Sequence, residues 1–302
     1  MKHRTLTSDI LLLITSAIWG FAFVAQRAGM AYIGPFLFNG IRFLLGSLTL
    51  LGVLFGMFRV TQKGQSFRAY LLRKEHVTAG FLAGIALTLG ASFQQMGIVS
   101  TTAGKAGFIT GLYVILVPIL GIFLGKRSYP EAWVGAVFAV IGLYFLTIGH
   151  RFSIAMGDLL VLISAVFWAA HVHIIDHYTS QMDSLPLAFF QFFFCGWVSL
   201  GLAIVLEPVE VPAIRAAWIP IAYAGLLSTA VAYTLQVVAQ KQAHHTHAAI
   251  LLSLEAVFAV IGGMWLLNET LTIRQWLGIA LMFSGMLLSQ FRWFSRKGRS
   301  EH

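Results

Sequence analysis

Ten apolar runs, each long enough to cross a membrane as a helix, follow one another along the chain with short connections between them. A helix needs about 20 mostly apolar residues to span the hydrocarbon core of a bilayer. The composition excludes a soluble domain, because 58% of the residues are hydrophobic and 10% are charged, whereas ordinary globular chains carry roughly 25% charged residues. We therefore predict an all-α membrane protein with ten transmembrane helices. They are expected at 9–28, 35–58, 77–98, 104–124, 131–149, 157–176, 186–206, 216–238, 247–267 and 272–291.

Basic residues are concentrated in alternate connections between these runs, which predicts the orientation of the chain. Lys and Arg collect on the cytoplasmic side of membranes. With the N-terminus in the cytoplasm, the inside segments hold fourteen Lys and Arg residues and the outside connections hold five, while Arg42 lies within a span. We expect a multi-pass protein of a bacterial inner membrane with both termini cytoplasmic. The inside residues are Lys2, Arg4, Arg59, Lys63, Arg68, Arg73, Lys74, Lys126, Arg127, Lys241, Arg292, Arg296, Lys297 and Arg299, and the outside residues are Arg27, Lys105, Arg151, Arg215 and Arg274.

Two separate blocks of the sequence show a duplicated unit. The segment 9–19 (DILLLITSAIW) aligns with 158–168 (DLLVLISAVFW) at an offset of 149. The segment 133–142, which holds a Trp-x-Gly and a later Gly, aligns with 276–285 at an offset of 143. Two blocks in the same order indicate that a unit of five helices occurs twice.

An odd number of helices in each unit means that the second copy enters the membrane in the opposite orientation. We therefore predict two inverted five-helix repeats, 1–149 and 150–302, around a central cavity. Inverted repeats are typical of secondary transporters, whose substrate site lies near the middle of the membrane between the repeats.

Several short motifs have the form found in one transporter family. They are Ile-Trp-Gly at 18–20, Gly-Pro-Phe at 34–36, Arg-Phe at 42–43, Leu-Glu-Ala-Val-Phe at 254–258 and Asn-Glu at 268–269. Together, on a ten-span inverted repeat, they resemble the drug/metabolite transporter superfamily, EamA type. The family usually has Pro and Gly where this chain has Ala256 and Asn268, so the resemblance does not assign a subfamily.

The resemblance implies a central cavity lined mainly by helices 1–4 and 6–9, with helices 5 and 10 at the periphery. It also implies efflux or exchange of a small organic metabolite, such as an amino acid or a related or drug-like compound. The expected partners are therefore that substrate and the lipid bilayer.

Two charged residues within spans are candidates for substrate contact. Arg42 lies in the second span, where a charged group must face protein or water because lipid penalises it. It could bind a substrate carboxylate, or it could be a structural tether. Glu255 is the one acidic residue placed clearly within a span, and a carboxyl group there suits proton coupling or amine binding. The alternative for Glu255 is a neutral, hydrogen-bonded side chain that fixes helix packing.

Five polar or aromatic residues in the spans are further candidates for lining the substrate site. Asn39 and Gln94 are polar groups at membrane depth, although interhelical hydrogen bonds explain most such residues. Trp19, Trp168 and Tyr113 could form aromatic walls, although core packing or lipid contact is equally common for such side chains.

Histidines in the sixth span raise an alternative function. His173 and His177 are four residues apart and share a helical face, a spacing that can bind a metal, and His171 and Asp176 lie beside them. A metal site would need a third ligand and supporting hydrogen bonds. The alternative is therefore a membrane-embedded metal-dependent enzyme, although a pH-sensitive gate or interfacial histidines explain the residues more simply. His244, His245 and His247 are interpreted as part of a solvated loop.

No catalytic constellation, nucleotide-binding loop or basic soluble module is found in the sequence, and Cys195 is the single cysteine. We predict a secondary-active transporter that works by alternating access, without a cofactor or bound metal, with protons as the candidate coupling ion and Glu255 as their site. An enzymatic or nucleic-acid-binding role is not expected. The substrate, the direction of net transport and the choice between monomer and homodimer stay open.

Features of helix packing are also visible in the sequence. Pro118 removes a backbone donor within the fourth span and predicts a kink or hinge there. Glycines four residues apart allow close helix approach and are interpreted as internal packing sites. These pairs are Gly52/Gly56, Gly80/Gly84, Gly107/Gly111 and Gly121/Gly125.

Overall fold

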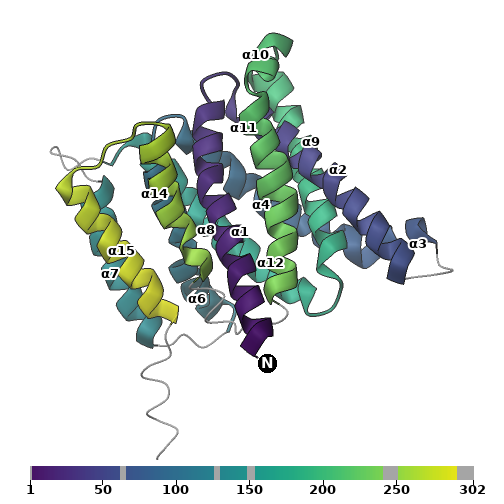
Figure 1. Cartoon of the computed structure of the whole chain (residues 1–302), viewed down its shortest axis with the longest axis horizontal. Coiled ribbons are helices and arrows are strands. Elements are labelled where there is room, and N and C mark those ends of the chain that lie inside the picture. The colour runs from purple at the N-terminus through teal and green to yellow at the C-terminus, as the bar shows by residue number, and fades with distance from the viewer. Residues whose placement is uncertain (1, 62–65, 126–129, 148–153, 241–250, 291–302) are drawn as a thin grey trace, which may run out of the picture.

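The computed structural model describes residues 2–61, 66–125, 130–147, 154–240 and 251–290. Within these ranges all regular structure is helical (Figure 1). Parts of the predicted charge pattern and one histidine group lie outside the described residues. These are Lys63, Lys126, Arg127, Arg151, Lys241, His244, His245, His247, Arg292, Arg296, Lys297 and Arg299.

The helices follow the predicted apolar runs closely. In chain order they are α1 (Lys2–Gly29), α2 (Pro35–Thr61), α3 (Phe67–Leu71), α4 (Lys74–Ile98), α5 (Ala103–Gly111), α6 (Tyr113–Phe123), α7 (Pro130–Thr147), α8 (Met156–Thr179), α9 (Ser184–Leu206), α10 (Val211–Ala216), α11 (Trp218–Ala222), the π-helix η1 (Tyr223–Ala232), α12 (Tyr233–Gln240), α14 (Glu255–Leu266) and α15 (Ile273–Gln290).

Eight helices in the described part of the chain are long and apolar enough to cross a membrane, and α5 with α6 counts as one of them. Two shorter apolar helices, Leu251–Leu266 and Ile273–Ser289, cover the ninth and tenth predicted runs. The multi-pass, all-helical architecture is therefore confirmed, while the number of ten crossings stays a prediction.

Large apolar side chains cover much of the outside of the bundle, and small side chains occupy many of the close helix contacts inside it. Trp133, Val137 and Val140 of α7 are 52%, 57% and 67% exposed, whereas Ala83 and Ala165 are fully buried. A soluble protein would show the reverse for large apolar residues. Because lipid tails do not drive apolar side chains inward, small residues that allow close helix approach occupy the interfaces instead.

The two ends of the bundle hold different basic residues. We call the end with the α1–α2 connection the upper end and the end where α1 begins the lower end, as they lie in Figure 1. Helix direction places the described residues of the predicted outside group at the upper end and those of the inside group at the lower end. The upper residues are Arg27, Lys105, Arg215 and Arg274, and the lower ones are Arg59, Arg68, Arg73 and Lys74.

At the lower end, the short helix α3 connects the chain to α9. The hydroxyl of Tyr70 donates a hydrogen bond to Oδ2 of Asp183 at 2.8 Å. Burial and this hydrogen bond raise the pKa of the Tyr70 phenol, so that it stays protonated and remains a donor at neutral pH.

Helices α7 and α15 form a separate antiparallel pair at one side of the bundle (Figure 1). A Cβ on Gly135 would lie 2.5 Å from the carbonyl oxygen of Gly285, and a Cβ on Gly285 would lie 2.6 Å from that of Gly135. Gly142 and Gly278 show the same reciprocal approach, at 2.6 and 2.7 Å. The two backbones therefore touch directly at two levels, and only glycine fits at these positions.

The predicted glycine pairs are only partly internal. Gly80 and Gly84 pack against α9, as expected. The interpretation of Gly52 and Gly56 as internal packing is wrong, because a Cβ on either residue would meet nothing within 4 Å. The spacing alone does not reveal which face of α2 is turned toward a neighbouring helix.

The π-helix η1 joins the middle of α1 to the second half of the chain. The side chain of Thr229 donates to the carbonyl of Ala224, five residues earlier, at 2.8 Å. The indole nitrogen of Trp19 donates to the carbonyl oxygen of Ser228 at 3.0 Å, and the Tyr223 hydroxyl donates to that of Ile18 at 3.1 Å. A wide π turn leaves carbonyl groups free for such contacts, and π segments occur often at functional sites.

The α7–α15 contact predicts opposite effects for the same substitution at two glycines. Replacing a helical glycine by alanine ordinarily stabilises by about 0.5–1 kcal/mol, and we expect this for Gly56→Ala. Gly142→Ala should instead lower the free energy of unfolding by about 1–3 kcal/mol, because the new Cβ strikes backbone that cannot move away. Unfolding of both purified variants in mild detergent measures the difference, and equal effects would contradict the packing described.

Candidate functional site

Buried amide side chains connect α1, α4 and α8 in the interior of the bundle. The Nε2 of Gln94 donates to Oε1 of Gln26 at 3.0 Å, and the indole nitrogen of Trp168 donates to Oε1 of Gln94 at 2.8 Å. The Nε2 of Gln95 donates to the backbone carbonyl of Gln26 at 3.3 Å. We call these four residues the amide network. Gln26, Gln94 and Gln95 belong to the first half of the chain and Trp168 to the second, so these hydrogen bonds depend on how the two halves are placed relative to each other.

The amide network continues toward α9 through a histidine. The ring of His171 packs edge-on against Trp168, with ring centroids 5.7 Å apart, and its Nε2 lies 2.7 Å from Oε1 of Gln191. The structure thus unites two predicted site residues, Gln94 and Trp168, with a histidine that the sequence suggested for a metal.

Arg42 is buried in α2 without a carboxylate partner among the described residues. Its side chain is 5% exposed, its Nε donates to Oδ1 of Asn39 at 2.9 Å, and its guanidinium lies 4.3 Å from the ring centroid of Phe43. The Nδ2 of Asn39 donates in turn to the carbonyl of Ala91 at 3.1 Å. Asn39 therefore orients Arg42 and leaves its positive charge without a neutralising anion.

Two helices break at matching positions. The amide of Leu112 donates to the carbonyl of Ile109, and that of Leu254 donates to that of Leu251, both at 3.2 Å. These tight bonds span three residues and locally interrupt the regular hydrogen-bond pattern of the apolar helices Ala103–Phe123 and Leu251–Leu266. The two breaks are 142 residues apart, which is within one residue of the offset found in the sequence.

The residues that follow the two breaks lie near each other. Tyr113 begins α6 and Glu255 begins α14, and the phenol of Tyr113 lies within electrostatic range of the Glu255 carboxyl group. Glu255 is 7% exposed. A Cβ on Gly111 would lie 3.9 Å from the Cβ of Ala256, which also brings the two breaks together. The structure therefore unites another predicted pair, Tyr113 and Glu255.

Other expectations for the site are placed differently. Trp19 bonds to the backbone of η1 and packs against the cluster of Leu12, Ala239 and Leu252. Pro118 lies inside α6, while the helix actually breaks six residues earlier, at Leu112. As the sixth residue of α6, Pro118 removes one backbone donor and frees the carbonyl of Val114, without ending the helix.

The histidines of α8, which is the sixth predicted span, do not form a metal site in the described residues. The Nε2 of His173 lies 2.8 Å from the carbonyl oxygen of Val117, and the ring of His177 packs against Tyr178. Within the described ranges no group of three His, Cys, Asp or Glu side chains is arranged to hold a metal ion. The hypothesis of a metal-dependent enzyme therefore has no structural support there.

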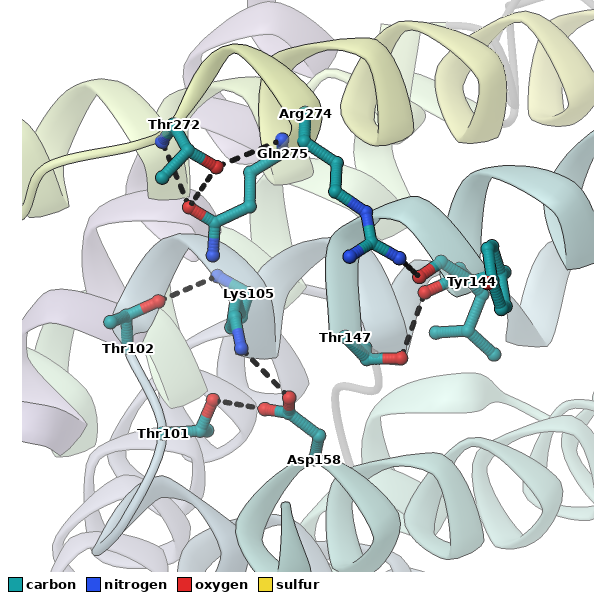
Figure 2. A network of polar contacts seen from close by, with 10 residues as sticks. Thr101, Thr102, Lys105, Tyr144, Thr147, Asp158, Thr272, Arg274 and Gln275 are labelled. Carbon is teal, nitrogen blue, oxygen red and sulfur yellow. Dashed lines mark hydrogen bonds and ion pairs between the residues drawn. The ribbon is translucent and has the colours of Figure 1, made fainter. Parts of the chain in front are cut away.

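Three carboxylates at the upper end were not among the predicted site residues. Asp158 of α8 is fully buried, accepts from Nζ of Lys105 at 2.9 Å and accepts from the Thr101 hydroxyl (Figure 2). Glu269 accepts from the backbone amides of Ala103 and Gly104, at 2.6 and 3.1 Å.

The third carboxylate, Glu207, binds the start of α2. It accepts from the backbone amides of Phe36 and Leu37, both at 2.8 Å. Unpaired amides and the helix dipole make the first turn of a helix a good position for an acidic side chain. The only signals in the sequence were the place of Asp158 in the duplicated block and that of Glu269 in a family motif, and Gln26 had none.

The described hollows lie near the ends of the bundle. One of about 350 Å³ at the upper end is lined by the α1–α2 connection with Val99 and Glu210. Another of about 300 Å³ at the lower end is lined by residues that include Tyr70 and Asp183. None of the predicted site residues lines either hollow.

The amide network predicts a stability effect for Gln94→Leu. This substitution leaves Gln26 and Trp168 without their shared partner, so the free energy of unfolding should fall by about 1–3 kcal/mol. The matched control is Gln181→Leu, whose amide bonds to the His177 carbonyl at an exposed position. We expect the control to change stability by less than about 0.5 kcal/mol. Equal unfolding midpoints for the two variants in detergent would contradict the network.

Comparisons with known proteins identify the fold and the family. The chain is similar over 98% of its length to a chain in a crystal structure, covering 99% of that chain, with a TM-score of 0.62 and 17% sequence identity, which supports the fold alone. It is 32% identical to an uncharacterized transporter of Archaeoglobus fulgidus, over 96% of this chain and 87% of the relative. It is 25% identical to the uncharacterized transporter YoaV of Bacillus subtilis, over 95% and 97% of the two chains.

One similar protein is named for an activity. It is a probable amino-acid metabolite efflux pump of Escherichia coli, 22% identical over 94% of this chain and 95% of the pump. The model of the EamA-like transporter family matches the chain twice, at residues 6–148 and 155–291. These matches cover nearly the whole sequence, and they agree with the multi-pass helical fold. The chain therefore belongs to the EamA-like transporter family.

Proposed function

We propose that this membrane transporter is a secondary carrier that exports or exchanges a small organic metabolite by alternating access. The observation that carries the proposal is the pair of matched helix breaks at Leu112 and Leu254, with Tyr113 and Glu255 beside them. Discontinuous helices at corresponding positions of two repeats are a general feature of substrate sites in secondary transporters.

The proposed architecture is two inverted five-helix repeats, 1–149 and 150–302, that cross the membrane ten times. Support comes from the double match of the family model. Further support comes from α7 and α15, where Gly135 touches Gly285 and Gly142 touches Gly278. Gly135 thus contacts the repeat counterpart of Gly142, and Gly142 contacts the repeat counterpart of Gly135, which is the pattern that a two-fold axis produces.

The proposed substrate contacts are Arg42 and Glu255. Arg42 offers a positive charge without a paired carboxylate to the anionic group of a substrate. A substrate carboxylate would therefore gain a bidentate, charge-assisted pair in a place of low dielectric. Asn39, Gln94, Trp168 and Tyr113 would line the same passage, and Trp19 would act through its contact with η1.

An amino acid or a relative of one fits this set of groups. Arg42 suits a carboxylate, Glu255 suits an amine or a proton, and the amides suit neutral polar groups. The efflux pump among the relatives supports the same class of solute. We place the protein in a bacterial inner membrane with both termini in the cytoplasm, so that the upper end faces outward. The sequence shows no nucleotide-binding loop, so a proton or solute gradient would supply the energy.

Proton coupling through Glu255 predicts a specific loss in Glu255→Gln. Reconstituted protein should accelerate solute flux when a pH gradient is applied, and Glu255→Gln should lose this acceleration but retain solute exchange. Glutamine keeps the shape of the side chain but does not carry a proton. Flux through proteoliposomes with and without the gradient measures the effect. Gradient-driven flux that is the same in both proteins would exclude coupling through this residue.

A role for Arg42 in anion binding predicts selective loss of carboxylate-bearing solutes. Arg42→Gln should raise the half-saturating concentration of such solutes roughly tenfold or more, the factor that about 1.4 kcal/mol of binding free energy produces. Arg59→Gln is the control, because Arg59 lies against Phe55 at the lower end of α2. A thermal-shift screen of amino acids, amines and nucleosides chooses the test solutes. An equal change for decarboxylated analogues would contradict the assignment.

A further inference from the structure

The start of α5 is bound by carboxylates from the second half of the sequence. Asp158 and Glu269 belong to the second segment that the family model matches, whereas Thr101, Lys105 and the two amides of Ala103 and Gly104 belong to the first. Four residues of one short stretch are thus held by two acidic side chains of the other segment. Figure 2 shows the contacts of Asp158 with Thr101 and Lys105.

Helix α5 is the first segment of the apolar span Ala103–Phe123, between these contacts and the tight turn at Leu112. It runs from Ala103 to Gly111, and the tight turn at Leu112 separates it from α6. Its side chains against α14 are small: a Cβ on Gly107 would contact Ala259, and one on Gly104 would contact Val260. Its larger side chains, Phe108 and Ile109, are fully buried in the core, so the face against α14 is the one that offers contacts of small residues across which the helix could shift.

The polar groups that hold the first turn of α5 can be pulled apart at a modest cost in free energy. Carboxylates, a lysine ammonium and backbone amides all bind water well once exposed, so breaking these contacts at the upper end exchanges protein partners for water. Breaking apolar contacts at the same place would cost more free energy, because apolar surface would become hydrated.

We propose that α5 is the upper gate of the carrier, that it pivots at Leu112, and that Asp158 and Glu269 latch it shut. The inference rests on the proposed function, since a gate matters only in a protein that opens to alternate sides. In this structure the latch is closed. When Lys105 leaves Asp158 and the first turn of α5 leaves Glu269, the helix moves away from α8 and the upper end opens.

The gate can be tested through a reporter cysteine on α5. Thr110 is 4% exposed and its hydroxyl has no hydrogen-bond partner among the described atoms, so Thr110→Cys is a mild change. Cys195 is the single cysteine of the chain and is removed as Cys195→Ala. Ser199→Cys is the control reporter, because Ser199 is equally buried and lies on α9, outside the gate.

The measurement is the rate at which a hydrophilic maleimide labels each reporter in purified protein. Asp158→Asn and Glu269→Gln should each speed labelling of Thr110→Cys roughly tenfold, because a weakened latch raises the population of the locally open form. Glu210→Gln should leave the rate unchanged, since Glu210 is exposed at the same end and forms no contact with α5 in the described part of the chain.

The outcomes separate the gate from the proposed function. Faster labelling at Thr110→Cys alone supports the gate, even if no solute flux is found, in which case only the carrier function fails. Unchanged labelling in both latch variants overturns the gate, whether or not flux is present. Equal acceleration at Ser199→Cys also overturns it, because the change is then a general loosening. If Asp158→Asn does not fold, Lys105→Gln tests the same contact through a partly exposed residue.

Discussion

Lipid tails neither donate nor accept hydrogen bonds, and the interior of this protein follows from that constraint. A polar group within a span must find its partner in the protein, because an unpaired one costs several kcal/mol. Gln26, Gln94 and Trp168 satisfy one another across three helices. Asn39 supports Arg42 and bonds to the backbone of α4. The outward faces, which have no such demand, carry large apolar side chains. The polar interior therefore holds the helices in register where apolar packing against lipid would not.

The sequence predicts the helices well, because each span is encoded locally by its length and hydropathy. It could not predict which residues meet. Gln94 and Trp168 were both candidates, but they are 74 residues apart and nothing in either neighbourhood names the other. The breaks at Leu112 and Leu254 occur in ordinary apolar sequence. Pro118, a residue type that usually interrupts helices, instead lies inside α6. The π-helix was also unexpected, and the hydrogen bonds of Trp19 and Tyr223 that accompany it join residues 209 and 205 positions apart.

Helix α5 connects the proposed substrate region to the upper end. Its last residue precedes Leu112 and Tyr113, and Tyr113 lies near Glu255. Its first turn is held by Asp158 and Glu269. In the proposed mechanism, a solute or proton at Glu255 would therefore act on the last residues of α5, while the first turn of the same helix is held by the latch. This arrangement couples binding to opening through a single short element, without a long chain of intermediate residues.

The glycine contacts between α7 and α15 also restrict the directions in which the molecule can move. Backbone touches backbone at two levels, so sliding one helix along the other would drive carbonyl oxygens and side chains into the space that the glycines keep free. Side chains of both helices, among them Met282 and Phe138, also pack against these glycines. The pair therefore resists sliding along its length.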